Sequence, residues 1–143
     1  MKYKILIVLF LIISCHTSFA GPTEIFLDIY NEARKEVNYV KQSTDEWKLH
    51  SEIDLKDVDC DGITFWMGGE AILRGVDASL FQYGIFEYRD EKTRHMAILY
   101  DIDGITTVIP SSGLKILSPF MNLDDYLFIT DMWLMESFQF IWE

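Results

Sequence analysis

Residues 97–109, with the sequence AILYDIDGITTVI, carry the clearest fold signal, because two apolar runs flank the pair Asp103-Gly104. An Asp-Gly pair in this position is typical of a two-residue hairpin turn, since Gly adopts the positive φ that the turn requires. The stretch therefore predicts two antiparallel strands, Met96–Ile102 and Ile105–Ile109.

Other short apolar runs, separated by turn residues, lie on both sides of this hairpin. Gly68-Gly69 gives a second two-residue turn signal. Near the C-terminus Phe138, Phe140 and Trp142 alternate with other residues, which suits a final strand. The remaining predicted strands are Ile63–Met67, Ala71–Leu73, Ala78–Tyr88 and Leu114–Leu117.

An amphipathic helix is predicted ahead of these strands, over about Thr23–Lys41. Its apolar residues recur at helical spacing, and charged residues occupy the other face. The fold class is therefore α+β, with this helix packed on an antiparallel sheet of about six to eight strands in one domain, residues 21–143. The run Ala78–Tyr88 is apolar on both faces, which one helix cannot cover. Either the sheet curls toward a barrel or an apolar face remains for a partner.

Residues 1–20 have the features of a cleaved secretory signal peptide. Lys2 and Lys4 precede the apolar run Ile5–Ile13, and Ser18-Phe19-Ala20 provides small residues where signal peptidase cleaves. The run is shorter than the about 20 apolar residues that span a bilayer. We therefore expect cleavage after residue 20 and an extracytoplasmic protein, either periplasmic or secreted.

A second interpretation of the same segment involves Cys15. The residues Ile12-Ile13-Ser14-Cys15 are similar to a bacterial lipobox, in which the cysteine becomes lipidated. This alternative makes the protein an outer-membrane lipoprotein, and it is the one case in which we expect contact with a membrane.

The chain is strongly acidic, with 23 Asp and Glu against 12 Lys and Arg. Removal of residues 1–20, which hold two lysines and no acid, changes the formal charge from −11 to −13. Nucleic-acid binding requires a basic stripe and is therefore not expected. The aromatic content of 15% indicates a folded domain despite this charge.

The segment Asp57-Val58-Asp59-Cys60-Asp61-Gly62 is the candidate metal site. It resembles the start of an EF-hand calcium loop and the shorter Asp-rich loops of exported bacterial proteins. The resemblance implies calcium as a cofactor, with side-chain ligands from Asp57, Asp59 and Asp61 and a carbonyl ligand from Ile63. It ends there, because Gly68 stands where an EF-hand has Glu. The alternative is ordinary turn chemistry, in which Asp bonds its own backbone.

No catalytic constellation is apparent in the sequence, so we expect a protein that is not an enzyme. Cys60 is the one thiol after the signal peptide, and such a residue is more often an apolar filler than a nucleophile. His50, Cys60 and His95 are too dispersed for a zinc pattern. Ser111-Ser112-Gly113 lacks the context of a nucleophile elbow.

The expected function is a small acidic exported binding protein that acts on a basic protein partner. In general character it is similar to periplasmic lysozyme inhibitors and toxin-immunity proteins. No basic residue follows Leu117, and the predicted contact residues are Asp124, Asp125, Asp131 and Trp133. The alternative is a calcium-stabilised, envelope-associated structural domain. A small hydrolase is the third, disfavoured class.

Overall fold

A computed structural model describes residues 20–41, 48–88, 93–114 and 117–134 of this chain. The predicted signal peptide and Cys15 fall in residues 1–19, outside the described part. The predicted strand at Phe138–Trp142 also lies outside it.

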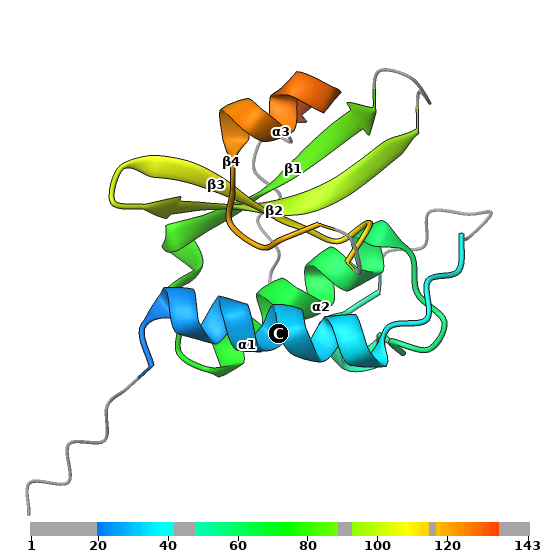
Figure 1. Cartoon of the computed structure of the whole chain (residues 1–143). Coiled ribbons are helices and arrows are strands. Elements are labelled where there is room, and N and C mark those ends of the chain that lie inside the picture. The colour runs from blue at the N-terminus through cyan, green and yellow to red at the C-terminus, as the bar shows by residue number, and fades with distance from the viewer. Residues whose placement is uncertain (1–19, 42–47, 89–92, 115–116, 135–143) are drawn as a thin grey trace, which may run out of the picture.

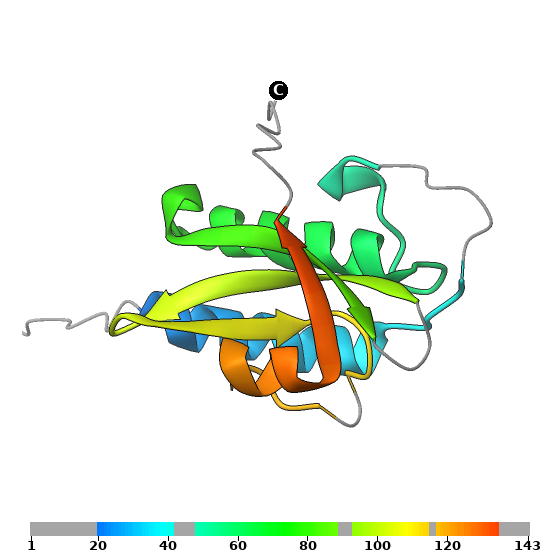
Figure 2. The same cartoon turned by 90° about the horizontal axis from the view of Figure 1, so that it is seen from above.

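The described residues form three layers, with a central antiparallel sheet between helices (Figure 1). Helices α1 (Pro22–Glu36) and α2 (Cys60–Leu73) cover one face, and α3 (Leu123–Ile129) lies on the other, as Figure 2 shows from above. The sheet has the order β4-β3-β2-β1-β5. Its strands are β1 (Phe81–Tyr88), β2 (Arg94–Ile102), β3 (Ile105–Pro110), β4 (Met121–Asn122) and β5 (Thr130–Leu134), and two 3-10 turns lie at His50–Glu52 and Ala78–Leu80.

The central hairpin is confirmed. Strands β2 and β3 pair from Ala97 with Pro110 to Ile102 with Ile105. Asp103 and Gly104 adopt φ values of 54° and 81°, and the Gly104 amide donates to Asp101 Oδ1 at 2.8 Å. These are the left-handed conformations that a tight hairpin turn requires.

The α+β class is correct, but the predicted count of six to eight strands is wrong for the described residues, which contain five. The sheet ends in β4 and β5 rather than closing into a barrel. Residues 114 and 117 are not in a strand. The second apolar face of β1 is covered by α3, where Tyr126 packs against Phe86 with ring centroids 4.8 Å apart.

The largest correction concerns α2, which replaces the predicted strands Ile63–Met67 and Ala71–Leu73 and the predicted turn at Gly68-Gly69. The helix lies between α1, β2 and the 3-10 turn at His50–Glu52, so apolar residues occur on most of its sides and no helical period is visible. Gly68 and Gly69 do not form a turn; the absence of a side chain at each leaves room for a neighbouring side chain. A Cβ on Gly68 would clash with the Tyr83 hydroxyl, and one on Gly69 with the His50 ring.

Helix α1 begins close to the predicted position but ends at Glu36, not at Lys41. The next residues become extended because their amides bond elsewhere. The Asn38 amide donates to the Leu55 carbonyl at 2.8 Å and the Val40 amide to the Val58 carbonyl at 2.9 Å. Between them Tyr39 forms a parallel bridge with Val58. This short pairing brings the chain after α1 beside the residues that begin α2.

None of the helices in the described ranges is long and apolar enough to cross a membrane.

Candidate functional site

Cys60 is the first residue of α2, and its position follows from the capping of that helix. Asp59 is the N-cap, and its Oδ1 accepts from the Gly62 amide at 3.4 Å. The Asp59 carbonyl accepts from the Ile63 amide at 3.0 Å. A thiol at a helix N-terminus lies at the positive end of the helix dipole, where a thiolate is stabilised.

The Cys60 thiol lies against the start of β2, on the backbone that flanks His95. Its Sγ is 3.9 Å from the Arg94 carbonyl oxygen, and the Met96 amide also hydrogen-bonds to it. Burial raises the pKa of the Cys60 thiol, the Met96 amide opposes this shift, and the charges of Asp61 and Asp59 add to it. The thiol is therefore largely protonated at neutral pH, and a nearby base is needed to make it a nucleophile.

Tyr39 is a second residue in contact with Cys60. The bridge to Val58 holds its backbone, and its hydroxyl hydrogen-bonds to the thiol. Burial, the charges of Cys60 and Asp59, and this hydrogen bond raise the pKa of Tyr39 to about 12. The hydroxyl therefore remains protonated at neutral pH and is available as a hydrogen-bond donor.

A cavity of about 490 Å³ lies beside Tyr39, which is one of its lining residues. His95 lines it, and the Nδ1 atom of His95 is buried. Ser111 lies on the same wall and donates through Oγ to the Met96 carbonyl, which fixes that wall against β2. The remaining lining residues are Arg34, Val37, Asn38, Tyr39, Ile63, Ser112, Gly113 and Leu114.

The predicted calcium ligands are at the same helix start, but none of them lines this cavity. Asp57, Asp59 and Asp61 all line a second, much smaller cavity. Burial, a hydrogen bond to the Asp59 carboxyl and its negative charge raise the pKa of Asp61 to about 7. Ile63, the predicted carbonyl ligand, is a buried residue inside α2. Among the described residues, no three His, Cys, Asp or Glu side chains converge closely enough to hold a metal ion.

The predicted partner-binding residues are in the last two elements. Asp124 and Asp125 are exposed in the first turn of α3. Asp131 and Trp133 are in β5, opposite Glu87 and Ile85 of β1. Their side chains fall outside the described part of the chain. The binding surface formed by these four residues therefore remains a prediction.

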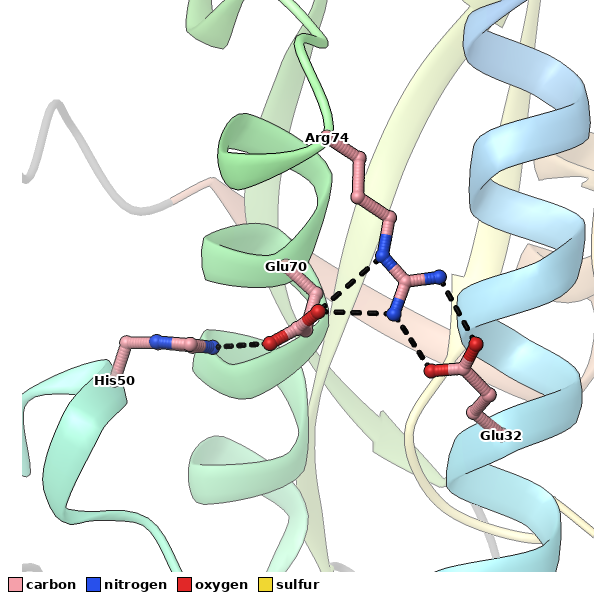
Figure 3. Close-up of polar contacts among 4 residues, drawn as sticks. All are labelled: Glu32, His50, Glu70 and Arg74. Atoms are coloured by element: carbon pink, nitrogen blue, oxygen red, sulfur yellow. Dashed lines mark hydrogen bonds and ion pairs between the residues drawn. The ribbon is translucent and has the colours of Figure 1, made fainter. Parts of the chain in front are cut away.

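A polar network connects α1, α2 and the 3-10 turn at His50–Glu52 (Figure 3). Arg74 forms ion pairs with both Glu32 and Glu70, and Glu70 also contacts His50 Nε2 at 3.1 Å. Arg74 follows the last residue of α2, so its guanidinium complements the negative end of that helix. This arrangement fixes the packing of the two helices that carry Cys60 and Arg34.

Sequence reasoning missed the proximity of Cys60 to the His95 segment, because 34 residues separate Cys60 from the Arg94 carbonyl that it contacts. The pairing of α2 with β2 creates this proximity, and α2 itself had been predicted as strands. The available signal was the Asp59-Cys60 pair, because Asp is a preferred N-cap and places the thiol in the first turn.

Comparison with known proteins gives a likeness in fold. No family model matches the sequence, and no curated protein matches it. Solved structures of Legionella pneumophila LapG do match. The EGTA-treated form has a TM-score of 0.65 at 12% identity, covering 84% of this chain and 72% of that one. The calcium-bound form has a TM-score of 0.63 at 15% identity, covering 85% and 77%. At this identity the likeness shows the shared fold alone.

Proposed function

We propose that this protein is an exported thiol hydrolase that cleaves an acyl bond, with Cys60 as nucleophile and His95 as general base. One observation carries the proposal: the Cys60 thiol, at the start of α2, lies on the backbone flanking His95, beside a cavity that His95 lines. A cysteine and a histidine far apart in sequence but adjacent in the fold are the elements of nucleophilic thiol catalysis. The expectation of a non-enzyme rested on the absence of a recognisable catalytic constellation in the sequence.

In this mechanism His95 accepts the thiol proton, and the thiolate sulfur attacks the acyl carbon of an amide or ester. The oxyanion that forms is close to the N-terminus of α2 and to the Tyr39 hydroxyl, which are the available donors. Collapse of the intermediate gives a thioester at Cys60, and the departing amine or alcohol takes the proton from His95. Water, deprotonated by His95, then hydrolyses the thioester and restores the thiol.

Ser112 is the candidate positioning residue for His95. Both residues line the cavity, and the described lining residues include no carboxylate that could orient the imidazole. Ser112 is 8% exposed, so it is a buried residue of this wall. A hydroxyl orients an imidazole less strongly than a carboxylate does, so we expect a slow enzyme.

The test is the rate at which iodoacetamide alkylates Cys60, followed by mass spectrometry of the Cys60 peptide. His95→Asn should slow alkylation at pH 7 by about ten-fold or more, because the base that forms the thiolate is removed. His50→Asn is the matched control, since His50 contacts Glu70 on another side of α2. Equal rates in the parent protein and His95→Asn would rule out the Cys60–His95 pair.

Calcium binding by Asp59 and Asp61 is a second candidate function, favoured by the hydrogen bond between the two carboxyls and by burial, which together with the Asp59 charge raise the pKa of Asp61 to about 7. Two carboxylates held together suit a hard cation, which would replace the proton on Asp61. The existence of a calcium-bound form of the structurally similar LapG supports this choice of ion. Asp57 lines the same small cavity and is the third candidate ligand.

Thermal unfolding with calcium and with EGTA tests this second candidate. We expect calcium to raise the melting temperature of the parent protein and to leave the Asp59→Asn/Asp61→Asn variant unchanged. Asp28→Asn is the control, because Asp28 is an exposed residue of α1. An equal response of the parent and the double variant would exclude these carboxylates as ligands.

A further inference from the structure

The candidate nucleophile is not itself on the surface of the cavity. Within the described part of the chain, the residues that line it include Tyr39, Ile63 and His95 but not Cys60. All three are close to the thiol: Tyr39 through its hydroxyl, Ile63 nearly one helical turn further along α2, and His95 between the two β2 residues whose backbone contacts Sγ. A substrate in the cavity therefore reaches Sγ only when one of these side chains moves aside.

Tyr39 is the one of these three residues with the most room to move. Ile63 is fully buried inside α2. His95 belongs to β2, where it is paired with Phe86 of β1. Tyr39, in contrast, is 45% exposed, and its backbone makes a single isolated bridge, to Val58. Exposed side chains change rotamer within nanoseconds, whereas packed helices and strands rearrange far more slowly.

The backbone on both sides of Tyr39 is held in place, so the ring and not the chain is the part that moves. Asn38 and Val40 each donate an amide hydrogen bond to the segment that precedes α2, and Asn38 Nδ2 adds a third bond to the Lys56 carbonyl at 3.1 Å. The ring itself is fastened by the hydrogen bond of its hydroxyl to the Cys60 thiol. One neutral hydrogen bond changes an equilibrium by a factor of about two to ten, so this fastening is reversible.

We propose that Tyr39 controls access to the thiol: in the resting protein its ring stands between Cys60 and the cavity, and it moves aside when an acyl substrate enters. The inference rests on the hydrolase proposal for its description of the ligand as a substrate. Movement of the ring breaks the hydrogen bond to Sγ and releases the hydroxyl to donate to the acyl oxygen of the substrate. A residue that closes the site until the substrate arrives also protects the thiol from other electrophiles.

The experiment compares two alkylating reagents of different size, iodoacetamide and pyrenyl iodoacetamide, by mass spectrometry of the Cys60 peptide. Both reagents carry the same reactive group and attack the same thiolate, so the ratio of their rates does not depend on how much thiolate is present. Iodoacetamide reaches the half-buried thiol with the ring in place, whereas the large aromatic reagent requires the ring to move. The ratio of the pyrenyl rate to the iodoacetamide rate therefore measures access past Tyr39.

Tyr39→Phe should raise this ratio by about two- to ten-fold, because the ring remains but loses its hydrogen bond to the thiol. Tyr39→Ala, which removes the ring, should raise it by more than about ten-fold. Val40→Ala is the matched control and should leave the ratio unchanged, since Val40 is an exposed neighbour that does not line the cavity. Tyr39→Phe preserves the ring and decides the question if Tyr39→Ala does not fold. A ratio in the Tyr39 variants equal to that of the parent protein, or an equal rise in Val40→Ala, would overturn the inference.

The access proposal and the hydrolase proposal fail separately. His95→Asn should slow both reagents by the same factor and leave their ratio unchanged, because it acts on the thiolate that both reagents attack. A ratio that depends on Tyr39, together with an iodoacetamide rate that does not depend on His95, would leave a shielded thiol without a hydrolase. The opposite pair of results would leave the hydrolase and show that its thiol is open to the cavity.

Discussion

Arg74 donates two hydrogen bonds to the Glu32 carboxylate, from Nη1 to Oε1 at 3.0 Å and from Nη2 to Oε2 at 2.6 Å (Figure 3). The pair joins the end of α2 to the middle of α1. Arg74 also bonds Glu70 one turn back, at 2.9 Å from Nη2. One guanidinium therefore holds two carboxylates between the helices that position the thiol and the cavity wall.

The first prediction concerns the strength of the Glu32–Arg74 pair. Its side chains are 46% and 31% exposed, so solvent screens the interaction, and we expect a coupling energy of about 0.5–1 kcal/mol. A double-mutant cycle with Glu32→Gln and Arg74→Gln, followed by urea unfolding, measures this coupling. Glu52→Gln is a control outside the network. A coupling energy of zero would show that the ion pair adds nothing to the free energy of unfolding.

The second prediction concerns Gly68, which permits α2 to approach β1. A methyl group there would clash with the Tyr83 hydroxyl, so Gly68→Ala should destabilise the fold by about 1–3 kcal/mol despite the better helix propensity of Ala. Adding Tyr83→Phe should recover part of the loss by removing the clashing oxygen. Gly21→Ala, where no atom lies within 4 Å of the added Cβ, should be nearly neutral. A stability of Gly68→Ala equal to that of the parent protein would show that the Tyr83 hydroxyl moves aside at little cost.

The hairpin was predictable because its turn chemistry is local. Asp103 and Gly104 carry the required conformations in the pair itself, and the strands on either side have a continuous apolar pattern. Helix α2 was not predictable in this way. Its apolar residues face α1 and the sheet, so the helical period is lost, and Gly68-Gly69 mimics a turn although both glycines are present to admit neighbouring side chains.

The same difference separates the two candidate sites. The pattern of Asp57, Asp59 and Asp61 is local and was visible, although in the structure Asp59 caps a helix and Asp61 lies within it. The proximity of Cys60 to the part of β2 that contains His95 depends on α2 packing against β2, a long-range contact that no spacing rule indicated.

The third prediction keeps the acidic face of α3 as a docking surface for a basic protein. Asp124 and Asp125 are exposed, so Asp124→Asn/Asp125→Asn should slow association with a cationic protein such as lysozyme and reduce its salt dependence. Stopped-flow fluorescence at low and high salt measures both. Asp28→Asn/Glu36→Gln on α1 removes the same charge elsewhere and should have a smaller effect. Equal effects of the two double variants would show general charge attraction rather than a docking surface.

The fourth prediction concerns pH and Asp61. Its pKa of about 7 in the folded protein is above its ordinary value of 3.8, so between these values the folded state binds more protons than the unfolded state. Stability in the presence of EGTA should therefore be greatest at the acidic end of the range and should fall as the pH rises from 5 to 7.5. The pKa of Glu32 is lowered by its hydrogen bonds to Arg74, so its contribution is lost only at lower pH, outside this window.

Asp61→Asn isolates this effect, because Asn preserves the shape of the side chain without an ionisable group. Melting temperatures of the variant should be nearly independent of pH from 5 to 7.5 and should exceed those of the parent protein at pH 7.5. Asp77→Asn is a suitable comparison, since Asp77 is fully exposed and its backbone contact with Ser79 lowers its pKa. A parent protein whose stability rises across this range would contradict the raised pKa of Asp61, and with it the main local reason to place a cation there.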